Sequence, residues 1–326
     1  MKPKGASKII VLITVLVLTS SASIATPVEA AGIYTHSVFV ERAIDRLSAH
    51  GGYSELVDIL NLYPGVVNDG ATFPDITYGG IDDDWAEILH DTGTLRSNYS
   101  KFLQFLVDKS YAYDWDLQAG RYREFLEDPV YTAIIPGFRA ALMSQVLDHF
   151  NNNPRSAEDE KTIAFLFGLI AHQEADIPWH WNCDDTSWRG LECAASADLG
   201  LSEYQLEMTV KYYHGGNSVD FSYVDTIYDT ILAASDAAGS RRPYCHTTCV
   251  AYPGDPIRTG NSNLLMYWNV PGVPPGWPWD WGGYNDYVYN HVPGGIYDGG
   301  ALVAGAWMQV WDKLSTKTIY LPIVNR

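Results

Sequence analysis

No part of the sequence narrows the choice of folds more than residues 161–176, KTIAFLFGLIAHQEAD. For ten residues this segment is apolar all round, and it becomes polar only at its end. A helix that is apolar on every face belongs in a protein core. The polar residues that follow therefore emerge inside the protein, where polar groups at this density need a partner.

The polar residues form a regular row, because His172, Asp176 and His180 in AHQEADIPWHW stand four residues apart. Steps of four keep side chains on one face of a helix, with the two histidines about 12 Å apart along its axis. At zinc–ligand distances of about 2 Å, one ion cannot bind both, so the row suits two neighbouring ions with Asp176 between them. Pro178 clashes with the carbonyl of Glu174, which predicts that His180 follows a kink. The alternative is an ordinary helix end with satisfied polar groups.

Helical patterns dominate the rest of the chain, and alternating strand patterns are nearly absent. The sequence therefore predicts an all-α fold. One helix is expected to begin with Thr35 as its N-cap and to end at Gly51 and Gly52. Further helices are expected at residues 99–106, 137–150 and 301–314.

Three segments are predicted to be irregular or extended. Residues 72–75, TFPD, are expected to form a loop because Pro74 pushes its predecessor out of the helical region. Residues 243–300 are rich in Gly, Pro, Trp and Tyr and are expected to form a long ordered excursion. The aromatic residues of this excursion either line a lipid or sugar site or pack the excursion itself. Residues 318–324 are expected to be extended.

Residues 1–30 have the layout of a secretory signal peptide. Lysines at positions 2, 4 and 8 precede an apolar stretch at 9–19 and a run of small residues. The stretch is shorter than the roughly 20 residues that span a bilayer, so a membrane anchor is the weaker interpretation. Cleavage after Ala30 is expected, which makes Ala31 the amino terminus of a secreted, extracellular protein.

The four cysteines all lie in the second half of the chain, at positions 183, 193, 245 and 249. In an exported protein, two disulfides are the natural expectation. Short loops close most easily, which favours pairing Cys183 with Cys193 and Cys245 with Cys249. A metal site made of four thiolates is the alternative, but neither pair has the C-x2-C spacing common in such sites.

The charge balance limits the class of partner. The chain has 21 Lys and Arg against 39 Asp and Glu, and removal of the leader leaves 18 against 38. Such a chain repels phosphate backbones, so bulk binding to nucleic acid or to an anionic membrane surface is not expected. A locally bound cation can still create a small anion site.

Two stretches, AFLFGLIAHQEADIPWHW and GIYTHSVFVERAIDRL, resemble the zinc-dependent phospholipase C family. They are most similar to the N-terminal catalytic domain of glycosylphosphatidylinositol-specific phospholipase D, and the resemblance covers residues 31–214. It implies an all-helical fold shared with bacterial phosphatidylcholine-cleaving enzymes and, more distantly, with fungal single-strand nucleases. It also implies a cluster of up to three zinc ions. We expect a catalytic domain at residues 31–316, followed by an extended tail at 317–326.

The resemblance implies zinc ligands residue by residue. His36, in THSVFVERA, is similar to the early histidine that shares a zinc ion with the free amino terminus, here Ala31. Asp75, in FPDITY, matches the aspartate that serves as ligand and proposed general base. His90, in WAEILHDTGT, resembles the histidine that follows it.

The row after the apolar helix completes the implied ligand set. His172 and Asp176 match the central zinc ligand and the bridging carboxylate, and His180 matches the ligand of the remaining zinc ion. The family then has a helix with His-x3-Glu or His-x3-Asp, and this sequence departs from that pattern. Glu207 fits the carboxylate position, whereas Glu203 stands where a histidine is expected.

The departure at position 203 leaves several interpretations open. Glu203 binds zinc through oxygen, or His214 replaces it, or one zinc ion is weakly held. An exposed Glu203 at a helix start, where the helix dipole favours an acid, is the alternative without a metal.

The implied reaction is hydrolysis of a phosphodiester, in which a metal-bound hydroxide releases a phospholipid headgroup. Asp75 is expected to orient or deprotonate the attacking water. A nuclease-like diesterase is one alternative, which the acidic charge balance disfavours. A secreted binding protein that kept the fold and lost turnover is another, which the missing histidine at position 203 permits.

Overall fold

The computed structural model describes residues 33–78, 90, 92–112, 114–179 and 295–319, with single positions between 207 and 237. Every regular element in these ranges is an α-helix, which confirms the predicted all-α fold. The helices are α2 (Ile33–His50), α3 (Ser54–Leu62), α4 (Pro64–Tyr78), α6 (Thr92–Asp108), α7 (Trp115–Glu127), α8 (Gly137–Asn151), α9 (Ala157–Trp179) and α16 (Ile296–Ile319).

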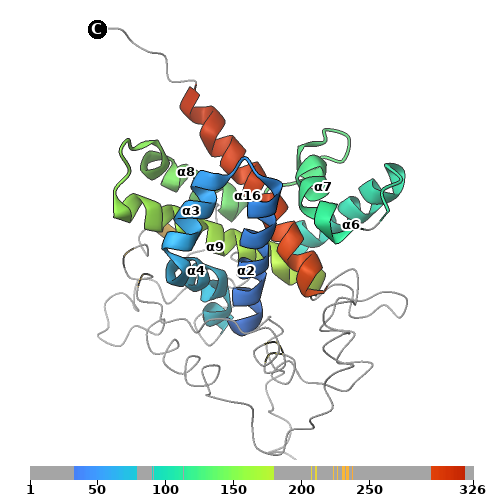
Figure 1. Cartoon of the computed structure of the whole chain (residues 1–326), viewed down its shortest axis with the longest axis horizontal. Helices are drawn as coiled ribbons and strands as arrows, with labels where there is room; N and C mark the ends of the chain where they lie inside the picture. Colours follow the sequence, from blue (N-terminus) through green and yellow to red (C-terminus); the bar gives the residue numbers. More distant parts are fainter. Residues whose placement is uncertain are drawn as a thin grey trace, which may run out of the picture.

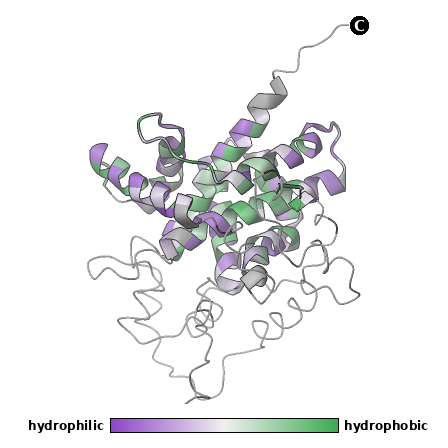
Figure 2. Cartoon of the chain, turned by 180° about the vertical axis from the view of Figure 1, so that it is seen from behind, coloured by the Kyte–Doolittle hydropathy of each residue, from purple (hydrophilic) through white to green (hydrophobic). Residues whose placement is uncertain are grey.

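Helix α9 lies at the centre of the assembly, where it contacts α4, α16, α8, α6 and α2 (Figure 1). Every side chain at residues 163–167 is fully buried, and Leu169, Ile170 and Ala171 are at most 2% exposed. The apolar segment therefore forms the predicted core helix. Hydrophilic residues cover the outward faces of the surrounding helices (Figure 2).

Two glycines allow α4 and α9 to touch backbone to backbone. A Cβ atom on Gly168 would lie 2.2 Å from the carbonyl oxygen of Val67, and one on Gly70 would lie 2.4 Å from that of Phe165. Cβ atoms essentially never approach other heavy atoms within 3.0 Å. Only glycine therefore fits at these two positions, and the resulting helix contact is the most extensive in the described part of the chain.

Helix α16 closes the core from the other end of the sequence. It packs along α2 and α7 and also reaches α9 (Figure 1). The indole Nε1 of Trp307 donates to the carbonyl oxygen of Phe167 at 2.7 Å. A Cβ atom on Gly299 would lie 2.6 Å from the ring of Phe39, so α16 also approaches α2 closely. These contacts hold α2 in place relative to α9.

The predicted loop at residues 72–75 is wrong, because these residues lie inside α4 and Pro74 is an interior residue of that helix. Pro74 has no N–H to donate to the carbonyl one turn earlier, which penalises the helix locally. Ala71 and Phe73 are fully buried, and α4 contacts the backbone of α9. This packing outweighs the local penalty, and Asp75 is presented by a helix.

Several helix boundaries also differ from the prediction. Helix α2 already begins at Ile33, so Thr35 lies within its first turn and is not its N-cap. Helix α16 begins inside the segment expected to be irregular and continues to Ile319, past the expected start of the extended tail. The helices predicted at 99–106, 137–150 and 301–314 are present as α6, α8 and α16. The search of the described helices found none with the length and hydropathy of a membrane span.

Replacing Gly168 with alanine is expected to destabilise the fold by about 3 kcal/mol, because the new Cβ would overlap the carbonyl of Val67. Urea unfolding followed by circular dichroism measures this change. Gly65→Ala on α4 is the matched control, since nothing lies within 4 Å of its Cβ position. That change should be neutral or stabilising by up to about 1 kcal/mol. Equal unfolding midpoints for the two variants would contradict the close crossing.

Candidate metal centre

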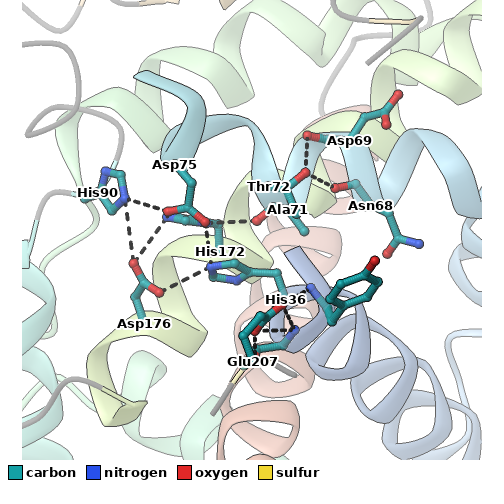
Figure 3. Close-up of polar contacts among 12 residues, drawn as sticks. His36, Asn68, Asp69, Ala71, Thr72, Asp75, His90, His172, Asp176 and Glu207 are labelled. Carbon is teal, nitrogen blue, oxygen red and sulfur yellow. Dashed lines mark hydrogen bonds and ion pairs between the residues drawn. The ribbon is translucent and has the colours of Figure 1, made fainter. Parts of the chain in front are cut away.

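Five of the expected ligands come together in the structure (Figure 3). His36 lies in the first turn of α2, Asp75 in the last turn of α4 and His90 just before α6. His172 and Asp176 are one turn apart near the end of α9 and share a face of that helix. Potential ligand atoms of His36, Asp75, His172 and Asp176 all lie within 4.8 Å of one another.

The two carboxylates stand between the histidines and share one pattern. Asp75 places Oδ2 3.3 Å from Nε2 of His36, and Oδ1 3.5 and 3.7 Å from Nε2 of His90 and His172. Asp176 places Oδ1 3.4 Å from Nε2 of His36, and Oδ2 3.8 and 3.2 Å from Nε2 of His90 and His172. On each acid, one oxygen faces His36 and the other faces the remaining two histidines.

These separations fit ligands of shared metal ions better than hydrogen bonds. Two ligands about 2.1 Å from a tetrahedral zinc ion lie about 3.4 Å apart, whereas N–H···O hydrogen bonds are typically about 2.9 Å long. Among the described residues, Nε2 of His36, Nε2 of His172 and Oδ2 of Asp75 are buried and have no hydrogen-bond partner. Imidazole nitrogen and carboxylate oxygen are both zinc ligands, so the donor set fits this metal.

His172 is held in the form that binds a metal ion. Its Nδ1 donates to the carbonyl oxygen of Ala71 at 2.8 Å. Because a carbonyl only accepts, the ring proton of neutral His172 is on Nδ1, and the Nε2 lone pair is available at the carboxylates. Metal-ligating histidines commonly use their second nitrogen in this way. The ring also stacks on His36, with centroids 4.2 Å apart, and lies edge-on to His90 at 4.5 Å.

Among the five groups, Asp75 is the most accessible to solvent. Its side chain is 14% exposed, against 4% for Asp176 and at most 2% for the histidines. Burial by itself raises the pKa of Asp75, but the neighbouring imidazoles of His172, His36 and His90 bring that pKa below its usual value. Asp75 is therefore a carboxylate on the accessible side of the cluster.

Glu207 is buried against the start of α2. Its carboxylate accepts the backbone N–H groups of Tyr34 and Thr35 and the hydroxyl of Thr35. Burial raises the pKa of Glu207 to about 7, although these hydrogen bonds act in the opposite direction. Thr35, expected to cap α2 with its own side chain, instead donates its hydroxyl to this distant acid.

Other expectations fall outside the described residues. These are the ligand roles of Ala31, His180 and Glu203, the alternative role of His214, both disulfides, the signal peptide and most of the aromatic-rich segment. They stay predictions.

A second polar cluster lies on another face of α9, and the sequence analysis did not identify it. Glu174 accepts from Nη1 of Arg139 at 2.5 Å and from the hydroxyl of Tyr122 at 2.6 Å. Nε of Arg139 donates to Oε1 of Gln173 at 3.0 Å. These bonds fix the rotation of α9 about its axis, and so the direction in which its metal-binding residues point. In the sequence, this cluster is indicated only by the polar residues Gln173 and Glu174, which directly follow the apolar run of α9.

The described residues form an all-α fold with a buried histidine and aspartate cluster whose ligand atoms suit zinc. The model of the zinc dependent phospholipase C family matches residues 35–234, and the chain belongs to this family. Searches among curated proteins and among solved structures gave no significant match. The closer likeness to glycosylphosphatidylinositol-specific phospholipase D stays a prediction.

Replacing Asp176 with asparagine is expected to weaken zinc binding by more than about 100-fold, beyond the effect typical of residues that only support a ligand. The change removes a negative charge and one of the two oxygens that face the histidines. Zinc retained after dialysis against a weak chelator, measured by elemental analysis, checks this. Asp45→Asn is the control, because that side chain is 68% exposed. Equal zinc retention in both variants would rule out Asp176 as a ligand.

Replacing Arg139 with methionine is expected to destabilise the fold by about 3–5 kcal/mol, because it leaves the buried charge of Glu174 without its partner. The matched control is Arg46→Met, since Asp116, the partner of Arg46, is 80% exposed. That change should cost less than about 1 kcal/mol. Urea unfolding of both variants tests the difference, and equal losses would contradict it.

Proposed function

We propose that this protein is a secreted zinc-dependent phosphodiester hydrolase of the phospholipase C type. The observation that carries the proposal is the convergence of three histidines and two aspartates, from four segments of the chain, on one buried cluster. Membership in the family supports a phospholipid as the substrate class. The predicted signal peptide at residues 1–30 supports secretion.

The two-sided pattern of the carboxylates supports a pair of ions that share Asp75 and Asp176. One ion would be held by His36 and the oxygen of each acid that faces it. The other would be held by His90, His172 and the second oxygen of each acid. In this arrangement, His36 would serve one ion, His90 and His172 would serve the other, and the two aspartates would serve both.

The remaining proposed ligands come from the family resemblance. The amino group of Ala31 is proposed to join His36 at its ion. The resemblance implies His180, Glu203 and Glu207 as ligands of a third ion, which brings the total to three. An amino terminus binds metal only as a free amine, so this part of the proposal requires cleavage after Ala30.

Bound zinc supplies Lewis acidity, which lowers the pKa of water to about 7 and offsets the negative charge of a phosphate. Asp75 would orient or deprotonate the attacking water, because it is a carboxylate at the accessible side of the cluster. His172 is not available for that task, since its Nδ1 is committed to Ala71 and its Nε2 faces the carboxylates. Asp176 is more deeply buried and serves to hold the cluster together.

Electrostatics favour a small substrate over a polymer. The chain has a formal net charge of −18, so a long phosphate backbone meets repulsion along its length. A single phosphodiester group meets only the cation cluster, where the positive charge is concentrated. A phospholipid headgroup fits this condition better than a nucleic acid does.

The purified secreted protein is expected to contain tightly bound zinc and to hydrolyse phosphatidylcholine or an inositol phospholipid, but not single-stranded DNA. The three substrates are assayed side by side, before and after removal of zinc with a chelator. Activity should disappear on removal and return with added zinc. Cleavage of DNA alone would indicate the nuclease-like alternative, and full zinc occupancy without cleavage of any substrate would indicate a binding protein.

A further inference from the structure

Glu207 makes its hydrogen bonds to a helix that begins more than 170 residues earlier in the chain. Its two oxygens lie 3.1 and 3.3 Å from the backbone nitrogen of Thr35. They also accept the backbone N–H of Tyr34 and the hydroxyl of Thr35. Glu207 is 1% exposed, so its carboxylate is buried against the first turn of α2 (Figure 3).

The first turn of α2 requires such a partner. The first four N–H groups of a helix have no acceptor within the helix, and an N-cap side chain or an early acidic residue usually serves them. Helix α2 has no acidic residue in its first turn. Tyr34 and Thr35 are at most 2% exposed, so bulk water does not serve their N–H groups. Glu207 therefore supplies the oxygen acceptors that the N–H groups of Tyr34 and Thr35 need.

The turn that Glu207 binds carries the first metal ligand. His36 follows Thr35 directly, and its Nε2 lies 3.3 Å from Asp75 and 3.4 Å from Asp176. Metal–ligand distances are held within about 0.2 Å. A small displacement of this turn would therefore take His36 out of range of its ion.

We propose that Glu207 is a positioning residue, which caps the first turn of α2 from a distant segment and so holds His36 at Asp75 and Asp176. This role rests on the zinc centre of the proposed function and is independent of the hydrolysis. It differs from the ligand role that the family resemblance implies for Glu207. The two roles can be separated by substitution, because a cap needs only an oxygen acceptor, which glutamine keeps, whereas a zinc ligand at this position needs a carboxylate.

The test compares Glu207→Gln with Glu207→Ala in the full secreted protein, using zinc alone as the probe. Zinc stoichiometry is measured by elemental analysis, and zinc affinity by competition with a coloured chelator. Glutamine keeps an oxygen that accepts the N–H groups of Tyr34 and Thr35. Glu207→Gln is therefore expected to keep the zinc stoichiometry of the unchanged protein and an affinity within about threefold, whereas Glu207→Ala is expected to lose roughly 10–100-fold in affinity.

Loss of one zinc ion in Glu207→Gln would overturn the proposal in favour of the ligand role, and this variant alone decides the matter if Glu207→Ala does not fold. Unchanged zinc affinity in a folded Glu207→Ala would also overturn it. A double-mutant cycle with His36→Ala provides the final check. If Glu207 acts through His36, Glu207→Ala should cause no further loss of affinity in the His36→Ala background, and additive losses would contradict this. None of these measurements depends on hydrolysis, so inactivity toward lipids leaves the proposal testable.

Discussion

The metal centre depends on one crossing of two helices. At Gly70 and Gly168, α4 and α9 touch backbone to backbone, and Asp75 and His172 follow after about one to one and a half turns of their respective helices. A side chain at the crossing would push the helices apart and separate the carboxylate from the imidazole. The carbonyl of Ala71 belongs to the same crossing and holds the ring of His172. One packing contact therefore sets both the distance between two ligand-bearing helices and the orientation of a ligand.

The same packing buries a group of ionisable side chains, and this burial costs free energy when no cation is bound to them. Two carboxylates and three imidazoles share a region with almost no solvent contact, and burial of such groups is unfavourable unless they are paired. A divalent cation makes the burial of these groups favourable, because it attracts every carboxylate and imidazole in the cluster. A ligand that binds only the folded state stabilises it by about 4 kcal/mol at a thousandfold excess over its Kd. Zinc bound at this cluster would therefore stabilise the fold in addition to any chemical role.

The sequence predicts α9 and the placement of His172 and Asp176 on one of its faces because both signals are local. A continuous apolar run marks a core helix, and a spacing of four places His172 and Asp176 on one face. The loop predicted at residues 72–75 rests on an equally local rule about Pro74, and contacts with α9 override it. His36, Asp75 and His90 were placed by family resemblance, since no spacing connects segments so far apart. The cap supplied by Glu207 crosses 172 residues, a distance that no periodic pattern spans.

The centre is completed by contacts between the two ends of the chain. His36 and its turn lie near the start, Glu207 closes that turn from the second half, and α16 packs the same helix against α9. Contacts between segments so distant in sequence must offset a loop-closure entropy cost when the domain folds. Metal binding adds its free energy to that same step, because the ligands are together only in the folded chain. Two residues, Ala31 and Gly32, separate the end of the predicted leader from Ile33. The predicted cleavage site, the first turn of α2 and His36 therefore all lie within residues 31–36. The position of His36 in the cluster depends on the conformation of this short segment.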